Sequence, residues 1–191
     1  MAEARRAWRA DLAGVDPGRL IFVDETGIDT RMTRAHARAA RGRRAPGKVP
    51  WGRWERLTVV GALGADGVVA CMSIAAATGT AVFLAFVEQA LVPALRGRPD
   101  ALVVMDNLAA HKAELVQAAL DRAGLGHCYL PPYSPDLNPI EQAWSKLKTR
   151  LRTVGARSRE ALDAALGPAL ATITAQDARA WFRRAGYAPA N

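Results

Sequence analysis

Apolar side chains are arranged along this chain in patterns that predict both strands and helices. Uninterrupted apolar runs at residues 20–23 and 101–105 predict buried strands, and an aspartate follows each run directly. Residues 56–63 and 68–74 are rich in β-branched side chains and flank an Asp-Gly pair, which predicts an antiparallel hairpin. The sequence therefore predicts a sheet in which two strands end at a carboxylate.

Helical spacing of apolar positions marks much of the remaining chain. Apolar side chains recur three and four positions apart in residues 80–95 and 139–153. Residues 3–13 and 111–123 also predict helices, a short strand is expected at residues 126–130, and two more helices are expected near the end of the chain. Strands and helices in this order predict an α/β fold, a mixed β-sheet flanked by helices.

Composition limits the class of protein. A chain of 191 residues, half of them apolar, suits one compact domain. No apolar run is long enough to span a membrane, and charged residues interrupt the first twenty positions, so we expect neither a membrane span nor a secretion signal. The two cysteines, Cys71 and Cys128, have no metal-binding spacing and suggest no disulfide framework. We therefore expect a cytoplasmic protein with no membrane partner.

Positive charge is concentrated in one stretch of the chain. The net charge is +8, and residues 31–56 hold nine Arg or Lys against one acid, with Trp51 and Trp54 among them. Clustered basic side chains attract nucleic acid because they release counterions from phosphates, although a solvated arginine-rich loop remains the alternative. A second cluster lies on the helix predicted at residues 139–153. The side chains expected to contact DNA are Arg43, Arg44, Lys48 and Arg53 in the first cluster, and Lys146, Lys148 and Arg152 in the second.

Two acids follow the predicted buried strands, Asp24 and Asp106. The carboxyl ends of strands in an open α/β sheet border a crevice, which is the usual place for a site. If the two strands are neighbours, their carboxylates repel each other unless they share a cation. Hard oxygen ligands suit Mg²⁺ or Mn²⁺. Taken singly, each aspartate could also be a turn former or a helix cap.

Glu141 is a third candidate acid with two roles open to it. Asn138, Pro139 and Glu141 form a capping-box pattern, with Asn at the N-cap, Pro at the first helical position and Glu at the third. The same placement puts Glu141 in the first helical turn, where its side chain can also point toward a cation above the sheet. Capping and cation binding are both compatible with the sequence.

Three segments together resemble a known family. They are F-V-D-E-T-G at residues 22–27, V-M-D-N-L-A-A-H-K at residues 104–112 and L-P-P-Y-S-P-D-L-N-P-I-E at residues 130–141. They resemble the motifs of the mariner-related bacterial insertion-sequence transposases, the six-thirty group, and the 34 residues between Asp106 and Glu141 resemble the spacing in that superfamily. The resemblance covers nearly the whole chain and implies a ribonuclease-H-like, retroviral-integrase-like fold.

The resemblance also implies a chemistry. The family's three acids correspond to Asp24, Asp106 and Glu141, which would hold two Mg²⁺ or Mn²⁺ ions, one to activate the nucleophile and one to stabilise the leaving oxygen. Asn107 and His111 belong to the second motif and are expected to support the site, although a hydrogen bond at a helix start is also open to His111. The implied substrate is double-stranded DNA: transposon ends are hydrolysed, and their 3′-hydroxyls then attack target DNA, commonly at TA dinucleotides.

Complete relatives carry helix-turn-helix units ahead of the catalytic domain. We therefore interpret residues 1–19 as the end of a linker helix to an N-terminal DNA-binding region, and residues 20–191 as the catalytic domain. The expected partners are a homodimer in the active complex and a separately encoded helix-turn-helix part, and the protein would associate with the bacterial nucleoid when on DNA. Three alternatives remain: an inactive or regulatory DNA-binding fragment, a ribonuclease-H-like nuclease without strand transfer, and, remotely, a glycosidase with a carboxylate pair.

Overall fold

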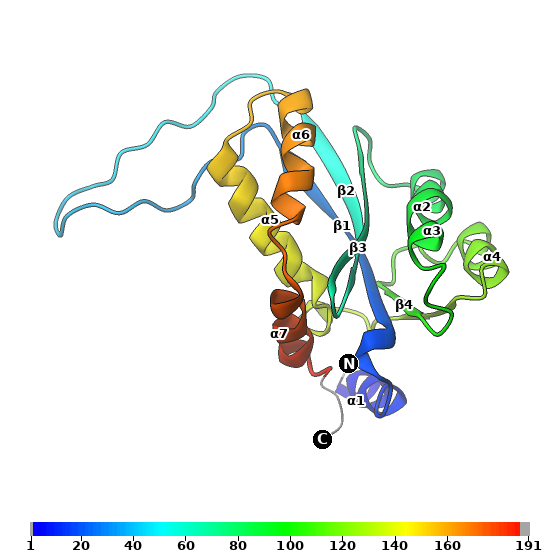
Figure 1. The fold of residues 1–191 in the computed structure, drawn as a ribbon. Coiled ribbons are helices and arrows are strands. Elements are labelled where there is room, and N and C mark those ends of the chain that lie inside the picture. Colours follow the sequence, from blue (N-terminus) through cyan, green and yellow to red (C-terminus); the bar gives the residue numbers. More distant parts are fainter. Residues whose placement is uncertain (1, 188–191) are drawn as a thin grey trace.

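The computed structural model describes residues 2–187, which form one five-stranded sheet with helices on both faces (Figure 1). Helices α5, α6 and α7 cover one face of the sheet, and α2, α3 and α4 lie on the other. The predicted α/β class is confirmed. The strands are β1 (Leu20–Asp29), β2 (Arg56–Gly64), β3 (Gly67–Ile74), β4 (Leu102–Met105) and β5 (Gly126–Tyr129); the helices are α1 (Ala2–Asp11), α2 (Thr80–Phe86), α3 (Val92–Ala94), α4 (Glu114–Arg122), α5 (Ile140–Val154), α6 (Arg159–Leu170) and α7 (Ala175–Ala185).

The sheet is mixed, with the strand order β3-β2-β1-β4-β5. The pairs β1–β2 and β2–β3 are antiparallel, whereas the pairs β1–β4 and β4–β5 are parallel. The predicted hairpin forms between β2 and β3, and Gly67 takes the positive φ of 124° that its turn requires. The strands that carry Asp24 and Asp106 are direct neighbours, as the cation hypothesis requires.

The prediction that the first strand ends at Asp24 is wrong. β1 continues to Asp29 because it pairs with β2 along its whole second half, from Asp24 opposite Gly61 to Asp29 opposite Arg56. Its pairing with β4 covers only residues 20–22. Asp24 therefore lies inside a strand, at the point where the neighbouring strand β4 has ended and one edge of β1 is open.

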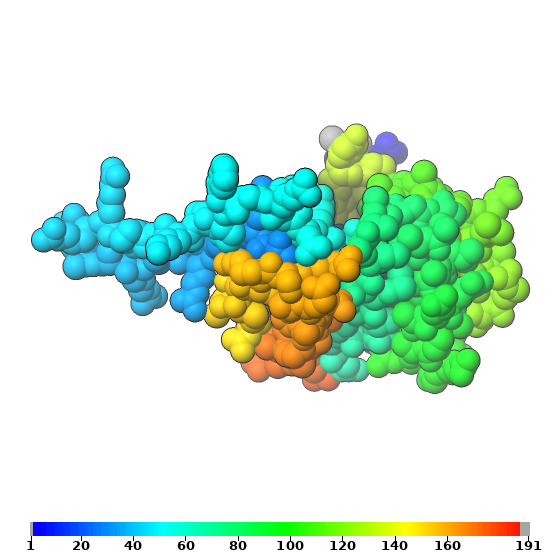
Figure 2. All heavy atoms as spheres, turned by 90° about the horizontal axis from the view of Figure 1, so that it is seen from above, coloured from blue at the N-terminus to red at the C-terminus, as the bar shows by residue number. Residues whose placement is uncertain are grey.

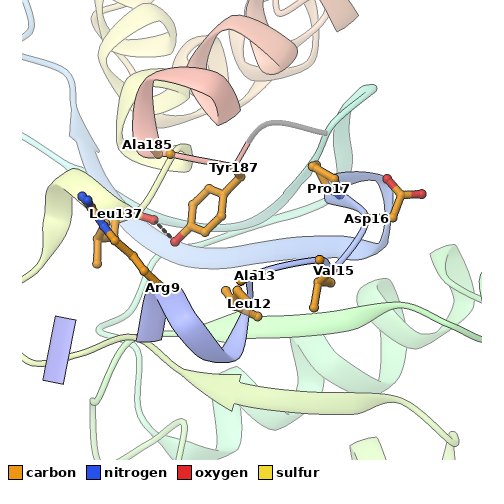
Figure 3. Close-up of a pocket in the computed structure, with 11 residues that line it drawn as sticks. Arg9, Leu12, Ala13, Val15, Asp16, Pro17, Leu137, Ala185 and Tyr187 are labelled. Atoms are coloured by element: carbon orange, nitrogen blue, oxygen red, sulfur yellow. Dashed lines mark hydrogen bonds between the residues drawn. The ribbon is translucent and has the colours of Figure 1, made fainter. Parts of the chain in front are cut away.

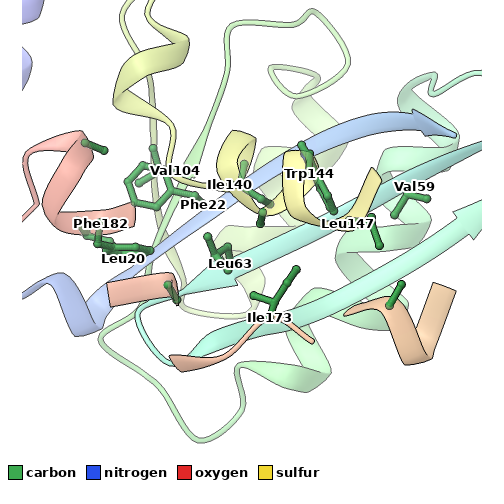
Figure 4. Packing of buried hydrophobic residues seen from close by; sticks show 14 of the residues in the cluster. Leu20, Phe22, Val59, Leu63, Val104, Ile140, Trp144, Leu147, Ile173 and Phe182 are labelled. Carbon is green, nitrogen blue, oxygen red and sulfur yellow. The ribbon is translucent and has the colours of Figure 1, made fainter. Parts of the chain in front are cut away.

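Alternate side chains of β1 enter two separate cores. Leu20 and Phe22 face the helices α5 to α7, and Ile21 and Val23 face α2 to α4. Figure 4 shows the first core, in which Phe22 meets the ring of Phe182 edge-on with the ring centroids 5.3 Å apart. Because side chains alternate, Asp24 lies on the α5 face of the sheet and Glu25 on the opposite face.

Two predicted helices differ from their expected form. The helix expected over residues 80–95 contains a π-helical turn, η2 (Val87–Leu91), just before Pro93, whose ring and missing N–H disturb a regular α-helix. The helix expected from residue 111 begins at Glu114, because residues 108–112 form a turn instead. The two C-terminal helices are confirmed. No helix within residues 2–187 is long and apolar enough to cross a membrane.

The basic stretch forms an extended projection, here called the basic arm (residues 30–55), between β1 and β2. Figure 2 shows the arm extending away from the body of the protein. Its base is fixed, because Arg157 donates to the carbonyl oxygens of Thr30 (2.9 Å) and Met32 (3.0 Å). Farther out, Trp51 is 100% exposed. The arm thus carries the largest charge cluster of the chain outside the packed fold.

Candidate active site

Asp24, Asp106 and Glu141 line one cleft of about 450 Å³. Asp24 comes from β1, Asp106 follows the last residue of β4, and Glu141 lies in the first turn of α5. The β1–β4 register aligns Phe22 with Val104, so the two aspartates, each two residues farther on, reach the same level. The loop between β5 and α5 forms the other wall of the cleft. Three distant segments therefore bring three acids together.

Asp24 is held by a buried indole. The Nε1–H group of Trp144 donates to Asp24 Oδ2 at 3.2 Å, from a ring that is 3% exposed. Gly61, opposite Asp24 in the sheet, makes room for this ring, because a Cβ at Gly61 would lie 2.6 Å from Trp144 Cη2. Burial raises the pKa of Asp24 to about 7, and the negative charges of Glu141 and Asp106 also raise it, outweighing the hydrogen bonds that lower it.

Asp106 is held in the opposite way, as a stabilised carboxylate. Its Oδ1 atom accepts a hydrogen bond from the Leu108 backbone N–H at 3.0 Å and lies 2.7 Å from His111 Nδ1. The His111 contact has the distance of a hydrogen bond but not its alignment, so it acts as an ion pair. Burial raises the pKa of Asp106, but His111, Leu108 and Lys112 lower it by more, and the net shift is downward.

His111 connects Asp106 to a second carboxylate, Glu25. Its ring is fully buried, packs 4.0 Å from the Phe83 ring centroid, and places Nε2 3.1 Å from Glu25 Oε1. Burial lowers the pKa of His111, but the two carboxylates outweigh it and raise the pKa to about 9. The side chain therefore does not cap a helix start, which was the other role open to it; it bridges β1 and the end of β4.

The predicted capping box of α5 does not form. Pro139 already has helical backbone angles and occupies the cap position, with no hydrogen bond from a side chain. The Asn138 side chain is buried, and its Oδ1 atom accepts no hydrogen bond from the helix or from any other residue within residues 2–187. Glu141 is consequently not engaged in capping, and its exposed side chain lines the cleft.

The loop between β5 and α5 is braced from both sides, and Asn107 is part of the brace. The Asn107 side-chain amide donates to the Leu130 backbone oxygen, which links the end of β4 to the start of the loop. Arg5 of α1 donates to both carboxylate oxygens of Asp136, at 2.8 and 2.5 Å. The structure thus places Asn107 on the cleft wall as a tie between loop and sheet.

The other predicted DNA contacts divide into two groups. Arg43, Arg44, Lys48 and Arg53 all lie on exposed positions of the basic arm. On α5, Lys146 forms an ion pair with Asp177, with Nζ 2.6 Å from Oδ2. Within residues 2–187, no such ion pair involves the remaining two basic residues predicted on this helix, Lys148 and Arg152.

The residues of the cleft fit divalent cations in their chemistry. Three carboxylates from three segments supply hard oxygen donors, and the mutual repulsion that helps raise the pKa of Asp24 would be relieved by a bound cation. Within residues 2–187, no three His, Cys, Asp or Glu side chains already converge as a complete ligand set. Mg²⁺ usually keeps several waters and takes only one or two carboxylates in proteins, so pairs of these acids suit it as ligands.

Sequence reasoning missed three residues that shape this site: Glu25, Gly61 and Trp144 as a partner of Asp24. In the sequence, Trp144 stands out only as one of the apolar positions that recur at helical spacing within residues 139–153. The role of Glu25 was missed because the strand was expected to end at Asp24, one residue earlier, whereas Glu25 lies inside β1. No local pattern marks Gly61, whose role depends on a side chain 83 positions later in the sequence.

A second cavity, of about 490 Å³, lies between α1, the turn after it and the end of α7 (Figure 3). Tyr187 forms one wall, and its hydroxyl donates to the Leu137 backbone oxygen at 2.7 Å. The cavity has one carboxylate, Asp16, which accepts from the Gly18 backbone N–H. It lacks the converging acids of the first cleft, so the cleft around Asp24 is the better candidate active site.

Comparisons with known proteins agree with this geometry. The structure is similar to the Mos1 transposase paired-end complex with left transposon end, with a TM-score of 0.76 and 17% identity, over 96% of this chain and 57% of that one. It is also similar to the catalytic domain of Mos1 mariner transposase, with a TM-score of 0.71 and 15% identity, over 96% of this chain and 85% of that one. These likenesses show the ribonuclease-H-like fold. The chain thus spans little more than half of the length of the transposase chain in the paired-end complex.

Sequence comparison gives the family. A search of curated proteins found no match. The family profile described as DDE superfamily endonuclease matches residues 19–163, a range that contains Asp24, Asp106, Glu141 and the loop that walls their cleft. The chain therefore belongs to the DDE superfamily endonucleases.

Proposed function

We propose that this chain is the catalytic domain of a DNA transposase that cleaves DNA strands and joins them to a target. The observation that carries the proposal is the meeting of Asp24, Asp106 and Glu141 in one cleft of a DDE-family chain. The three motifs around these acids further support a mariner-related bacterial insertion-sequence element of the six-thirty group. Such an enzyme would act on the nucleoid, in the cytoplasm.

Asp24, Asp106 and Glu141 are the residues that would hold two Mg²⁺ or Mn²⁺ ions. Mos1 transposase has been solved with each of these metals, which supports the assignment. Bound in this way, the cations supply a nucleophile at neutral pH and charge stabilisation for the leaving oxygen. The protein's own residues prepare the site: Leu108 and His111 hold Asp106 Oδ1, and Asp24, whose pKa is about 7, would be held as a carboxylate by a cation.

The DNA partner is supported by charge and by shape. The basic arm presents Arg43, Arg44, Lys48 and Arg53 to solvent, where they can neutralise phosphates. On α5, the helix that carries Glu141, Lys148 and Arg152 offer further phosphate contacts, whereas Lys146 must leave Asp177 to do so. Phosphate contacts position a duplex without reading its sequence, so binding by this chain should be weak, nonspecific and sensitive to salt.

The proposal extends to partners outside this chain. Mos1 transposase has been solved in a paired-end complex with a transposon end, which supports transposon ends as substrates and a homodimer in the active complex. Recognition of particular ends would come from a helix-turn-helix part, to which residues 1–19 would connect. Insertion at TA dinucleotides rests on the family resemblance alone.

The test is a strand-joining assay with the purified chain in Mn²⁺ or Mg²⁺. A short duplex with a labelled, recessed 3′-hydroxyl end is incubated with supercoiled plasmid, and labelled plasmid is quantified. The unmodified chain should join the label to plasmid, and both Asp24→Asn and Glu141→Gln should reduce joining by at least 100-fold, since catalytic acids commonly contribute about this much or more.

The alternatives predict other outcomes of this assay. Plasmid nicking without joined label would favour a ribonuclease-H-like nuclease without strand transfer. Salt-sensitive DNA binding with neither nicking nor joining would favour an inactive or regulatory fragment. Activity that survives both substitutions would contradict the assignment of the acids.

A further inference from the structure

One aromatic side chain on the rim of the cleft is displayed in an unusual way. Tyr133 lines the same cleft as Asp24, Asp106 and Glu141, yet its side chain is 89% exposed. Its backbone has a φ of +52°, and within residues 2–187 no other residue except glycine has a positive φ. This left-handed conformation is unfavourable for a bulky side chain. Strained residues of this kind cluster at functional sites.

The flanking residues hold Tyr133 in place. Ser134, which is 5% exposed, donates its hydroxyl to the Pro132 backbone oxygen at 3.2 Å and accepts from Arg5 Nη1 at 3.1 Å. Prolines at positions 131, 132 and 135 restrict the backbone further. The loop is therefore stiff, and the backbone of Tyr133 is fixed relative to the acids, while the ring itself is exposed on the rim of the cleft.

We propose that Tyr133 stacks on an unpaired nucleobase next to the DNA strand that is cut or joined. The proposal rests on the proposed function, because it takes DNA as the substrate of this cleft. Aromatic rings bind nucleobases through their faces and tolerate any base. Inside a duplex both faces of a base are covered by neighbouring bases, so an exposed ring on a rigid loop can stack only on a terminal or flipped-out base. Tyr133 would thus position an opened DNA end beside the carboxylates.

The backbone strain provides a sharp test. Asparagine tolerates the left-handed conformation far better than tyrosine, so Tyr133→Asn removes the ring while relaxing the loop. A loss of DNA binding in this variant, with an unchanged or higher Tm, cannot then come from misfolding. Tyr133→Phe is the matched control, because it keeps the stacking face and loses only the hydroxyl.

The experiment measures binding of two short duplexes in the absence of divalent cation. One duplex carries 2-aminopurine as an unpaired nucleotide at its end, and the other carries it paired inside a blunt duplex. The unmodified chain and Tyr133→Phe should quench the unpaired probe and bind the frayed duplex more tightly. Tyr133→Asn should lose the quenching and raise the Kd for the frayed duplex by about fivefold or more, the low end of stacking effects, while the Kd for the blunt duplex changes less than twofold.

Two results would overturn the proposal: equal quenching by Tyr133→Asn and the unmodified chain, or no preference of the unmodified chain for the frayed duplex. Neither result bears on the assignment of the acids, because Asp24→Asn and Glu141→Gln test that assignment separately, through strand joining in the presence of cation. Conversely, if the unmodified chain fails to join or cut DNA yet shows ring-dependent quenching, the proposed catalytic function fails while the stacking site stands.

Discussion

The two sides of the cleft treat similar aspartates in opposite ways. On the β1 side, Asp24 is partly buried and accepts a hydrogen bond from Trp144, and its pKa is raised to about 7. On the β4 side, Asp106 is 36% exposed, faces the buried His111, and its pKa is lowered. At neutral pH, Asp24 is therefore divided between its protonated and its ionised form, whereas Asp106 is an ionised carboxylate that the protein stabilises without a cation.

This difference corresponds to two tasks in a cation site: one carboxylate is oriented before the cation binds, and the other gains stability when it binds. A carboxylate paired with His111 is oriented before a cation arrives, because Oδ1 is engaged and, within residues 2–187, no hydrogen bond is formed to Oδ2. A carboxylate that shares a crowded cleft with two others gains most from a cation, since binding removes both repulsion and a bound proton. The same substitution on the two sides should therefore have effects of opposite sign.

The largest effect is expected for Asp106→Asn. This change leaves His111 buried with Glu25 as its remaining carboxylate partner. We expect the free energy of unfolding at pH 7 without cation to fall by about 3 kcal/mol, the low end for breaking a buried pair, because Asp106 is partly exposed. Urea denaturation measures it, and a neutral or stabilising effect would contradict the role given to His111.

Gly61→Ala, on the β1 side of the cleft, should lower the free energy of unfolding almost as much. The new methyl group would lie 2.6 Å from Trp144 Cη2, and the buried indole must move, carrying its hydrogen bond to Asp24 with it. A loss of roughly 2 kcal/mol in urea denaturation is typical of such overpacking. Gly97→Ala is the matched control, since nothing lies within 4 Å of its new methyl group and its stability should be unchanged.

Asp24→Asn should stabilise the protein without cation. The folded-state pKa of about 7 exceeds the ordinary value of 3.8, so this residue's contribution to stability is full below about pH 4 and is lost as the pH rises through 7. At pH 8, asparagine removes a buried charge, and we expect a gain of roughly 1–2 kcal/mol, discounted for partial exposure. Urea denaturation at pH 5 and pH 8 tests this: the gain must be larger at pH 8.

Trp144→Phe gives the smallest and most specific effect. It retains a buried ring but removes the N–H that donates to Asp24, so the pKa of Asp24 should rise above 7. The pH at which Asp24 loses its proton should move upward by a few tenths, about what one partly exposed hydrogen bond contributes. A ¹³C-carboxyl NMR titration of Asp24 reports this directly. Loss of packing alone would lower stability without moving the titration.

The sequence was sufficient for the order of the elements and for naming three acids that the fold brings to one cleft, and it was insufficient for the surroundings of these acids. Apolar runs and spacing located the strands of both aspartates, since burial of one face imposes a local period. The motifs identified Glu141 as a candidate site residue, although the capping-box pattern around it also offered a purely structural role. The roles of Glu25, Gly61 and Trp144 arise from contacts between segments distant in sequence, and no local pattern encodes them. The extent of β1 was also missed, because pairing with β2 extends the strand through polar residues.

The most direct test of the account is thermal unfolding at pH 7.5 with and without millimolar Mn²⁺, for the unmodified chain, Asp24→Asn and Glu141→Gln. A cation that binds only the folded state raises its stability by about 2.7 kcal/mol at one hundred times its Kd. The account predicts a rise in Tm of several degrees for the unmodified chain and none for either variant. An equal rise in all three proteins, or no rise in the unmodified chain, would contradict a shared cation site built from β1 and α5.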